Sequence, residues 1–99
     1  MHVALSESST VVAAPEQIWC DLGGEAALLH LSRGIYYGLD SVGARVWTLI
    51  QTPTCVRNVR DTIVREYDVE VDRCERDLLS LFAELAAAEL IVVTDQPGR

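Results

Sequence analysis

The sequence contains no lysine, only two histidines and only three cysteines. Cys20, Cys55 and Cys74 are odd in number and widely spaced, and they include no C-x-x-C pair. This pattern argues against a disulfide framework and against a structural zinc site. We therefore interpret the cysteines as small apolar packing residues.

Long apolar runs are also missing. No segment approaches the roughly 18–20 apolar residues that span a bilayer. The first residues have neither the basic region nor the apolar stretch of a signal peptide. The sequence therefore predicts a cytoplasmic protein that does not associate with a membrane.

Positive charge is scarce, because eight arginines stand against 15 acidic residues, for a net charge of −7. An acidic protein is a poor candidate for binding a nucleic-acid backbone. In the predicted third helix, Arg73 and Arg76 are outnumbered by acidic neighbours. We therefore expect no nucleic-acid partner and keep a DNA-binding regulator only as an alternative function.

Sequence motifs that carry enzyme chemistry are absent. There is no G-x-x-x-x-G-K-[ST], no G-x-G-x-x-G and no H-E-x-x-H. His30 lies in a predicted strand and is interpreted as structural, and Asp21 beside Cys20 opposes a reactive thiolate. The prediction is a protein without catalytic residues, metal or cofactor.

Length and composition predict one folded domain. The chain has 99 residues, of which 49% are hydrophobic, enough for a single modest core. The polar ends predict flexible tails at residues 1–9 and 94–99, on either side of a domain at residues 10–93.

The first forty residues have the pattern of an antiparallel meander. Residues 10–12 form a short β-branched run, and Gly23-Gly24 predicts a hairpin between strands at 17–21 and 25–31. Residues 35–39 are rich in aromatic and branched side chains, which favour another strand.

After residue 40 the apolar spacing changes to three and four, which predicts three helices. Ser41 is the predicted N-cap of the first helix, and Pro53 ends that helix. Thr54 is the predicted N-cap of the second helix. Asp72 and Glu75 resemble a capping box at the start of a third helix that runs to about residue 89. Residues 90–93 are either a packed tail or a strand.

Strands followed by helices indicate an α+β fold. We expect a three-stranded antiparallel N-terminal sheet packed on three C-terminal helices, in a winged helix-turn-helix-like arrangement.

One segment is distinctive: Gly34-Ile-Tyr-Tyr-Gly-Leu-Asp-Ser-Val-Gly-Ala-Arg-Val-Trp47. Its G-x-Y-Y-x-L-[ND]-x-V-G-x-x-[IV]-W pattern resembles the PqqD-like family, the leader-recognition elements of ribosomally made, post-translationally modified peptides. Residues 26–31, 66–69 and 77–92 agree with the family in order, so the likeness covers about residues 10–93. Glu89 stands where members often have glycine, which leaves the capping of that helix end open.

Within the family, the pattern is most similar to the free-standing recognition proteins of lasso-peptide biosynthesis. The resemblance implies three partners: a precursor leader peptide, a leader protease related to transglutaminases, and a macrolactam synthetase resembling asparagine synthetase. A PqqD-type chaperone for a radical-enzyme pathway and an assembly subunit without a peptide of its own stay open as alternatives.

The resemblance also implies a binding site. Family members bind the leader as a strand added beside the third strand, in a cleft against the third helix. The expected peptide-binding residues on the strand edge are Ile35, Tyr36, Tyr37, Gly38 and Leu39. Those on the helix are Arg76, Leu79, Phe82 and Ala83. Tyr36 and Tyr37 alternate, so one of them should face the core and the other the groove or solvent, and the sequence leaves open which of the two faces the groove.

Overall fold

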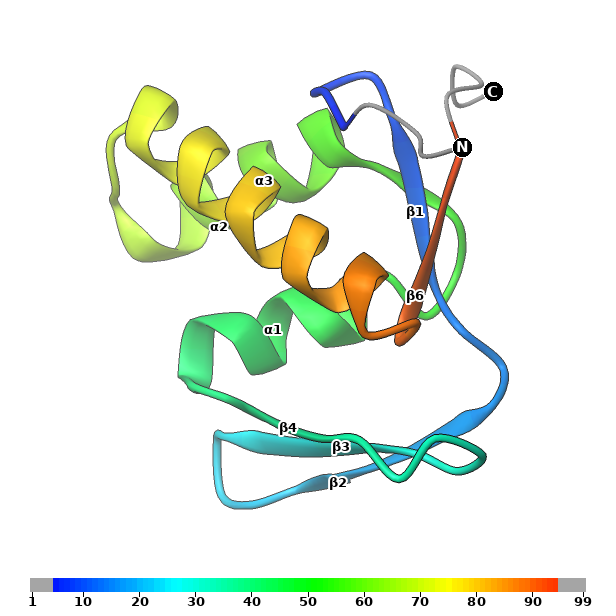
Figure 1. Ribbon diagram of the computed structural model, residues 1–99. Helices are drawn as coiled ribbons and strands as arrows, with labels where there is room; N and C mark the ends of the chain where they lie inside the picture. The colour runs from blue at the N-terminus through cyan, green and yellow to red at the C-terminus, as the bar shows by residue number, and fades with distance from the viewer. Residues whose placement is uncertain (1–4, 95–99) are drawn as a thin grey trace.

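The computed structural model describes residues 5–94, which fold into two three-stranded antiparallel sheets and three helices (Figure 1). The elements in chain order are β1 (Thr10–Ala13), β2 (Gln17–Asp21), β3 (Ala26–His30), β4 (Tyr36–Leu39), α1 (Ser41–Leu49), β5 (Thr54–Cys55), α2 (Val56–Tyr67), α3 (Val71–Ala87) and β6 (Ile91–Thr94). The predicted α+β class is confirmed.

The first sheet has the order β2-β3-β4, so β2 and β4 are its two edges. The predicted hairpin is present: Gly23 and Gly24 adopt positive φ angles of 77° and 101°. Asp21 Oδ1 accepts hydrogen bonds from both glycine N–H groups, at 3.0 and 3.1 Å. Glycine is favoured here because a side chain would strain the backbone of the turn.

The second sheet corrects the prediction of a single meander. β1 does not join β2 but lies between β5 and β6, where Val11 is opposite Thr54 on one side and Val93 on the other. Within the segment 90–93, residues 91–93 therefore belong to a strand, β6, rather than to a packed tail. The partners of β1 come from the middle and the end of the described chain, so no local pattern could reveal them.

The helix starts also differ from prediction. The N-cap of α1 is Asp40, one residue before the predicted Ser41, and its Oδ1 accepts from the Gly43 N–H at 2.8 Å. The N-cap of α2 is Cys55, without a side-chain bond, and Thr54 lies in β5.

The capping box predicted at Asp72 and Glu75 is wrong. α3 starts at Val71, after an N-cap Glu70 that makes no side-chain cap bond. The Glu75 carboxylate instead accepts a hydrogen bond from Arg60 on α2, at 2.6 Å. The Glu75 side chain, which a capping box would use, therefore forms an ion pair with a distant residue instead.

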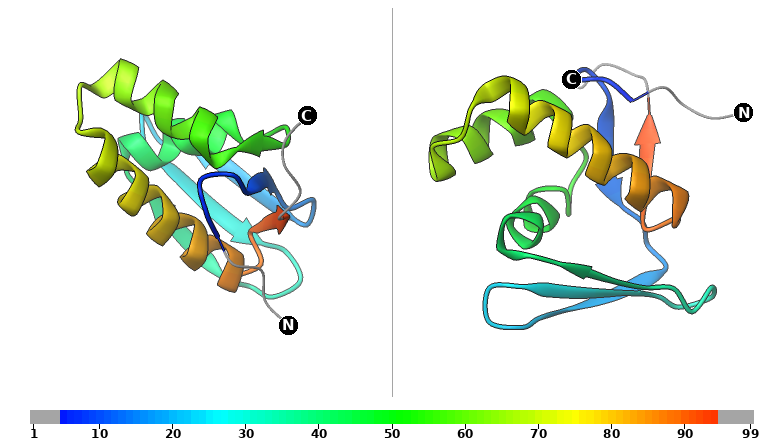
Figure 2. Two further views of the ribbon diagram at one scale, coloured as in Figure 1. Left: turned by 90° about the horizontal axis from the view of Figure 1, so that it is seen from above. Right: turned by 60° about the vertical axis from the view of Figure 1, so that its left-hand side comes forward.

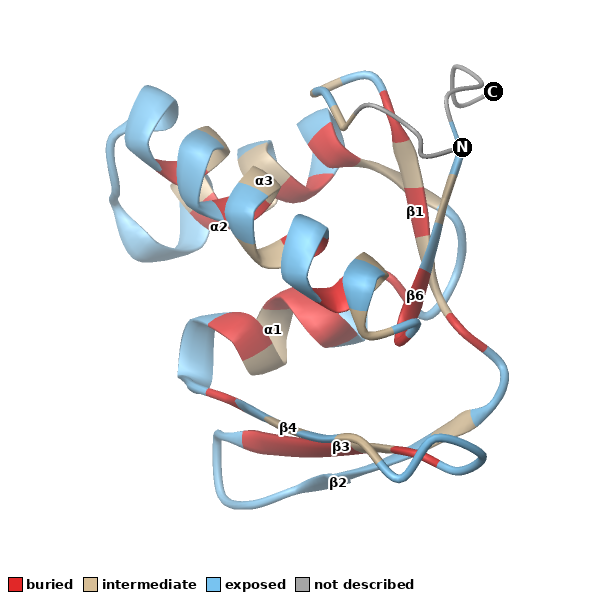
Figure 3. Cartoon of the chain, viewed as in Figure 1, coloured by how far each residue is buried: buried red, intermediate tan, exposed pale blue. Residues whose placement is uncertain are grey.

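The core lies where α1 is packed between the first sheet and the α2–α3 pair (Figures 1 and 2). Its largest fully buried side chains come from all three layers (Figure 3). They include Trp47, Phe82, Leu28, Ile50 and Leu85.

The flexible tail expected at residues 1–9 is held in place over residues 5–9. The Glu7 and Ser9 carbonyls accept hydrogen bonds from the N–H groups of Arg57 and Val56, both at 2.9 Å, and Leu5 packs against the core. Residues 1–4 and 95–99 lie outside the described residues. Among the helices that the structure describes, none is long and apolar enough to cross a membrane.

Candidate functional site

The outer edge of β4 is open. His30 N–H donates to the Ile35 carbonyl at 2.9 Å, so residues 35, 37 and 39 bond toward β3. The alternation of an antiparallel ladder then turns the N–H and C=O groups of Tyr36 and Gly38 away from β3. No other strand within residues 5–94 pairs with this edge. It can therefore accept an additional strand.

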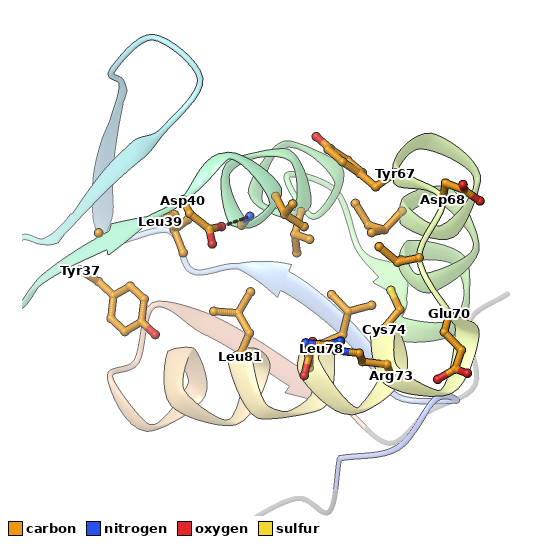
Figure 4. A pocket seen from close by; sticks show the side chains of 17 residues that line it. Tyr37, Leu39, Asp40, Tyr67, Asp68, Glu70, Arg73, Cys74, Leu78 and Leu81 are labelled. Carbon is orange, nitrogen blue, oxygen red and sulfur yellow. Dashed lines mark hydrogen bonds and ion pairs between the residues drawn. The ribbon is translucent and has the colours of Figure 1, made fainter.

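A groove of about 970 Å³ adjoins this edge and runs toward the joint between α2 and α3 (Figure 4). Its apolar lining includes Leu39, Val42, Val46, Ile63, Leu78 and Leu81. Its charged lining consists of Asp40, Asp68, Glu70, Arg73 and Asp77. Apolar pockets with a few polar groups are typical of binding sites for peptides and small molecules.

The two adjacent tyrosines point to opposite faces of β4. Tyr36 is 68% exposed, whereas Tyr37 lines the groove beside Leu39. The Tyr37 hydroxyl donates a hydrogen bond to the Glu84 carboxylate on α3. That bond and partial burial raise the pKa of Tyr37 to about 12. The question left open by the sequence is thereby answered: Tyr37 is the groove residue.

The face of α3 that lines the groove is not the predicted one. Five residues spaced by three and four positions form this wall: Arg73, Cys74, Asp77, Leu78 and Leu81. The four predicted helix residues are not among the groove-lining residues: Phe82 is fully buried in the core, Leu79 packs against the core, and Arg76 and Ala83 are exposed. A helix turns by about 100° per residue, so an error of one residue moves the assigned face by more than a quarter turn.

Residues 25–91 match the protein family described as coenzyme PQQ synthesis protein D (PqqD). The chain belongs to the PqqD family. The family that the 34–47 motif predicted is thus confirmed.

A solved structure, TbiB1 in complex with the TbiA(beta) leader peptide, is similar to this PqqD-family chain. The two share 35% sequence identity with a TM-score of 0.76, over 81% of this chain and 93% of TbiB1. No curated protein sequence matches this chain significantly.

Sequence reasoning missed part of the groove of this PqqD-family protein. Val42 and Val46 contribute from α1, and residues 67–70 contribute from the joint between α2 and α3. The sequence held one signal for Val42, its place in the 34–47 motif, and in the structure its side chain is 37% exposed.

The titratable groups near the groove do not assemble a reactive centre among the described residues. Cys74 lies at the base of the groove, where burial, and then the nearby Asp77, raise the pKa of its thiol. A raised pKa disfavours the nucleophilic thiolate. His30 is buried in β3, and its Nδ1 lies 3.3 Å from the backbone nitrogen of Arg33. Within residues 5–94 no three metal-ligating side chains cluster.

Proposed function

We propose that this PqqD-family protein binds the leader segment of a ribosomally made precursor peptide as a fourth strand of the β2-β3-β4 sheet. The observation that carries the proposal is the open edge at Tyr36 and Gly38, which adjoins a largely apolar groove. The 35% identical TbiB1 was solved in complex with a leader peptide, which supports the same function here.

Strand addition explains how one groove can combine affinity with selectivity. Main-chain hydrogen bonds to Tyr36 and Gly38 hold any extended peptide, and each contributes about 0.5–1.5 kcal/mol net. Alternate side chains of the added strand would point toward the apolar lining at Leu39, Val42 and Leu81. Residues 35–39 are the proposed strand contacts, and Arg73, Asp77 and Leu81 the proposed helix contacts.

The proposed role is to hold the leader while other proteins act on the precursor. The expected partners are those of lasso-peptide biosynthesis: a transglutaminase-like leader protease and an asparagine-synthetase-like macrolactam synthetase. The chain itself would perform no chemistry, and the step would take place in the cytoplasm, where the precursor is made.

Calorimetry with a synthetic leader tests this function. The probe is the leader of the cognate precursor peptide, and a scrambled leader of equal composition is the control. We expect a Kd of about 1 µM or tighter, equivalent to about 8 kcal/mol. Absence of heat with the true leader, or equal heat with the scrambled one, would contradict the proposal.

A matched pair of variants locates the site. Leu81→Arg places a charge on the apolar lining and should weaken leader binding at least tenfold. Ser80→Arg adds the same side chain at an exposed neighbouring position outside the groove lining and should bind like the wild type. Circular dichroism of both variants checks that the fold is retained.

A further inference from the structure

The opposite edge of the same sheet, β2, is an exposed apolar strand. Ile18 is 53% exposed, Trp19 is 39% exposed, and Cys20 is also exposed. Edge strands of stable monomers usually carry lysine, proline or a bulge, because an apolar edge invites pairing with another strand. Within its five residues β2 has no lysine and no proline, and its pairing with β3 is continuous.

The backbone of β2 directs the N–H and C=O groups of every second residue away from β3. Leu22 N–H donates to Glu25 at 2.7 Å, and Leu31 N–H donates to Glu16 at 3.1 Å, so even-numbered residues of this strand bond toward β3. Gln17, Trp19 and Asp21 therefore direct their N–H and C=O groups outward. Within residues 5–94 no strand pairs with this edge.

We propose that the β2 edge pairs with the β2 edge of a second copy of this chain, antiparallel and centred on Trp19. In that register Trp19 is opposite Trp19 of the second copy, and Gln17 is opposite its Asp21. All three outward-facing residues then form hydrogen-bonded pairs, six bonds in total, because each such pair exchanges two.

The charges along β2 fit this register. Asp21 is opposite an amide side chain rather than a carboxylate, and Glu16 is opposite Leu22 of the second copy. If the second copy is shifted along β2 by two residues in one direction, Pro15, which has no N–H, lies opposite Asp21 of the other copy. The same shift the other way carries Gln17 into the Gly23-Gly24 turn. The centred register therefore makes the most hydrogen bonds without opposing two carboxylates.

The dimer would leave the peptide groove open. β4 lies at the other edge of the sheet, so two copies would form a six-stranded sheet with a free β4 edge at each end. On the face turned away from the helices, Ile18 would lie opposite Cys20 of the second copy. The proposal is thus independent of leader binding.

Engineered cysteines test the register. Residues 18 and 20 of opposing copies would form a non-hydrogen-bonded pair with Cα atoms about 4.5 Å apart, within the range for a disulfide. Under mild oxidation, Ile18→Cys should therefore form a disulfide-linked dimer through the native Cys20. Wild type, Ile18→Cys/Cys20→Ser and the exposed control Ser80→Cys should stay largely uncrosslinked. Strong crosslinking of wild type or of the double variant would indicate another register and overturn this one.

Sedimentation measures the association without a crosslink. The average mass should rise from 10.9 kDa toward twice that value between micromolar and millimolar protein. Salt should favour the dimer, because each copy carries a net charge of −7. Ile18→Lys should weaken self-association at least tenfold while leader binding is unchanged. The proposal would be overturned if the protein had the mass of one chain at every concentration and Ile18→Cys formed no disulfide. That outcome does not depend on whether the leader binds.

Discussion

The hydroxyl of Tyr37 on β4 donates a hydrogen bond to the carboxylate of Glu84 on α3. The bond joins the strand wall of the groove to α3, at a position one helical turn beyond the groove-lining Leu81. It couples the position of α3 to the strand edge on which a peptide would lie. A single substitution of Tyr37 therefore removes a side-chain hydrogen bond between β4 and α3.

Tyr37→Phe should lower the free energy of unfolding by about 1 kcal/mol near neutral pH, the usual net value of one hydrogen bond. The pKa of Tyr37 is about 12 in the folded protein and about 10 in the unfolded chain. The contribution is therefore complete below about pH 10 and is lost as the pH rises toward 12. Urea unfolding at about pH 8 and about pH 11 measures the difference between wild type and variant. A difference that does not shrink at the higher pH would contradict this account.

Gly38→Pro should weaken leader binding about tenfold, because it removes one outward-facing N–H from the β4 edge. The ladder to β3 does not use this N–H, and proline is tolerated on a free edge. Gly38→Ala is the matched control: a Cβ there meets no atom within 4 Å, and the N–H is kept. If both variants bound alike, the leader would not be held through the Gly38 N–H.

Arg60→Met should lower the free energy of unfolding by about 1–3 kcal/mol. The Arg60 side chain is only 16% exposed, and its guanidinium contacts Glu7 at 3.1 Å, Asp61 at 3.0 Å and Glu75 at 2.6 Å. These bonds, that to Glu75 above all, raise the pKa of Arg60, so its charge is retained at every ordinary pH.

Arg57→Met is the matched control for the Arg60 network. Arg57 is 48% exposed and reaches Glu7 only at 3.4 Å, so its loss should change stability by no more than about 0.5 kcal/mol. Thermal unfolding of both variants compares them directly. Equal effects would mean that burial of Arg60 does not strengthen its ion pairs.

Glu89→Gly should stabilise the protein by about 0.5–1 kcal/mol. Glu89 has a positive φ of 60° after α3, where Leu90 N–H donates to Leu85 and Glu89 N–H to Ala86. This is a Schellman motif, in which glycine avoids the strain of a side chain.

The substitution also removes an exposed ion pair with Arg33 at 2.9 Å, which is worth little. Glu89→Ala removes the same pair but keeps the Cβ, so it should not stabilise. Denaturant midpoints of the three proteins separate the two effects. If Glu89→Ala raised the stability as much as Glu89→Gly, the destabilising feature at this position would be the carboxylate and not the strained backbone.

Several features could be predicted from the sequence because local chemistry determines them. The Gly23-Gly24 turn needs positive φ angles, and the 34–47 motif combines a strand with the start of a helix over adjacent residues. Of the five strand residues expected to bind the peptide, Tyr37, Gly38 and Leu39 line the groove, whereas Ile35 and Tyr36 are not among its lining residues. Their contact with a leader peptide stays a prediction.

Other features were decided only by tertiary packing. β1 pairs with strands formed by residues 54–55 and 91–94, and Arg60 draws Glu75 away from a helix cap. The rotation of α3 about its axis depends on how Phe82 fits the core, and this rotation puts Arg73, Asp77 and Leu81 on the groove. Sequence by itself determined the three helices and the strands before them, though not β5 or β6, because turns and periodicity act between near neighbours. Which face of α3 meets β4 depends on contacts between distant residues, which only the folded chain brings together.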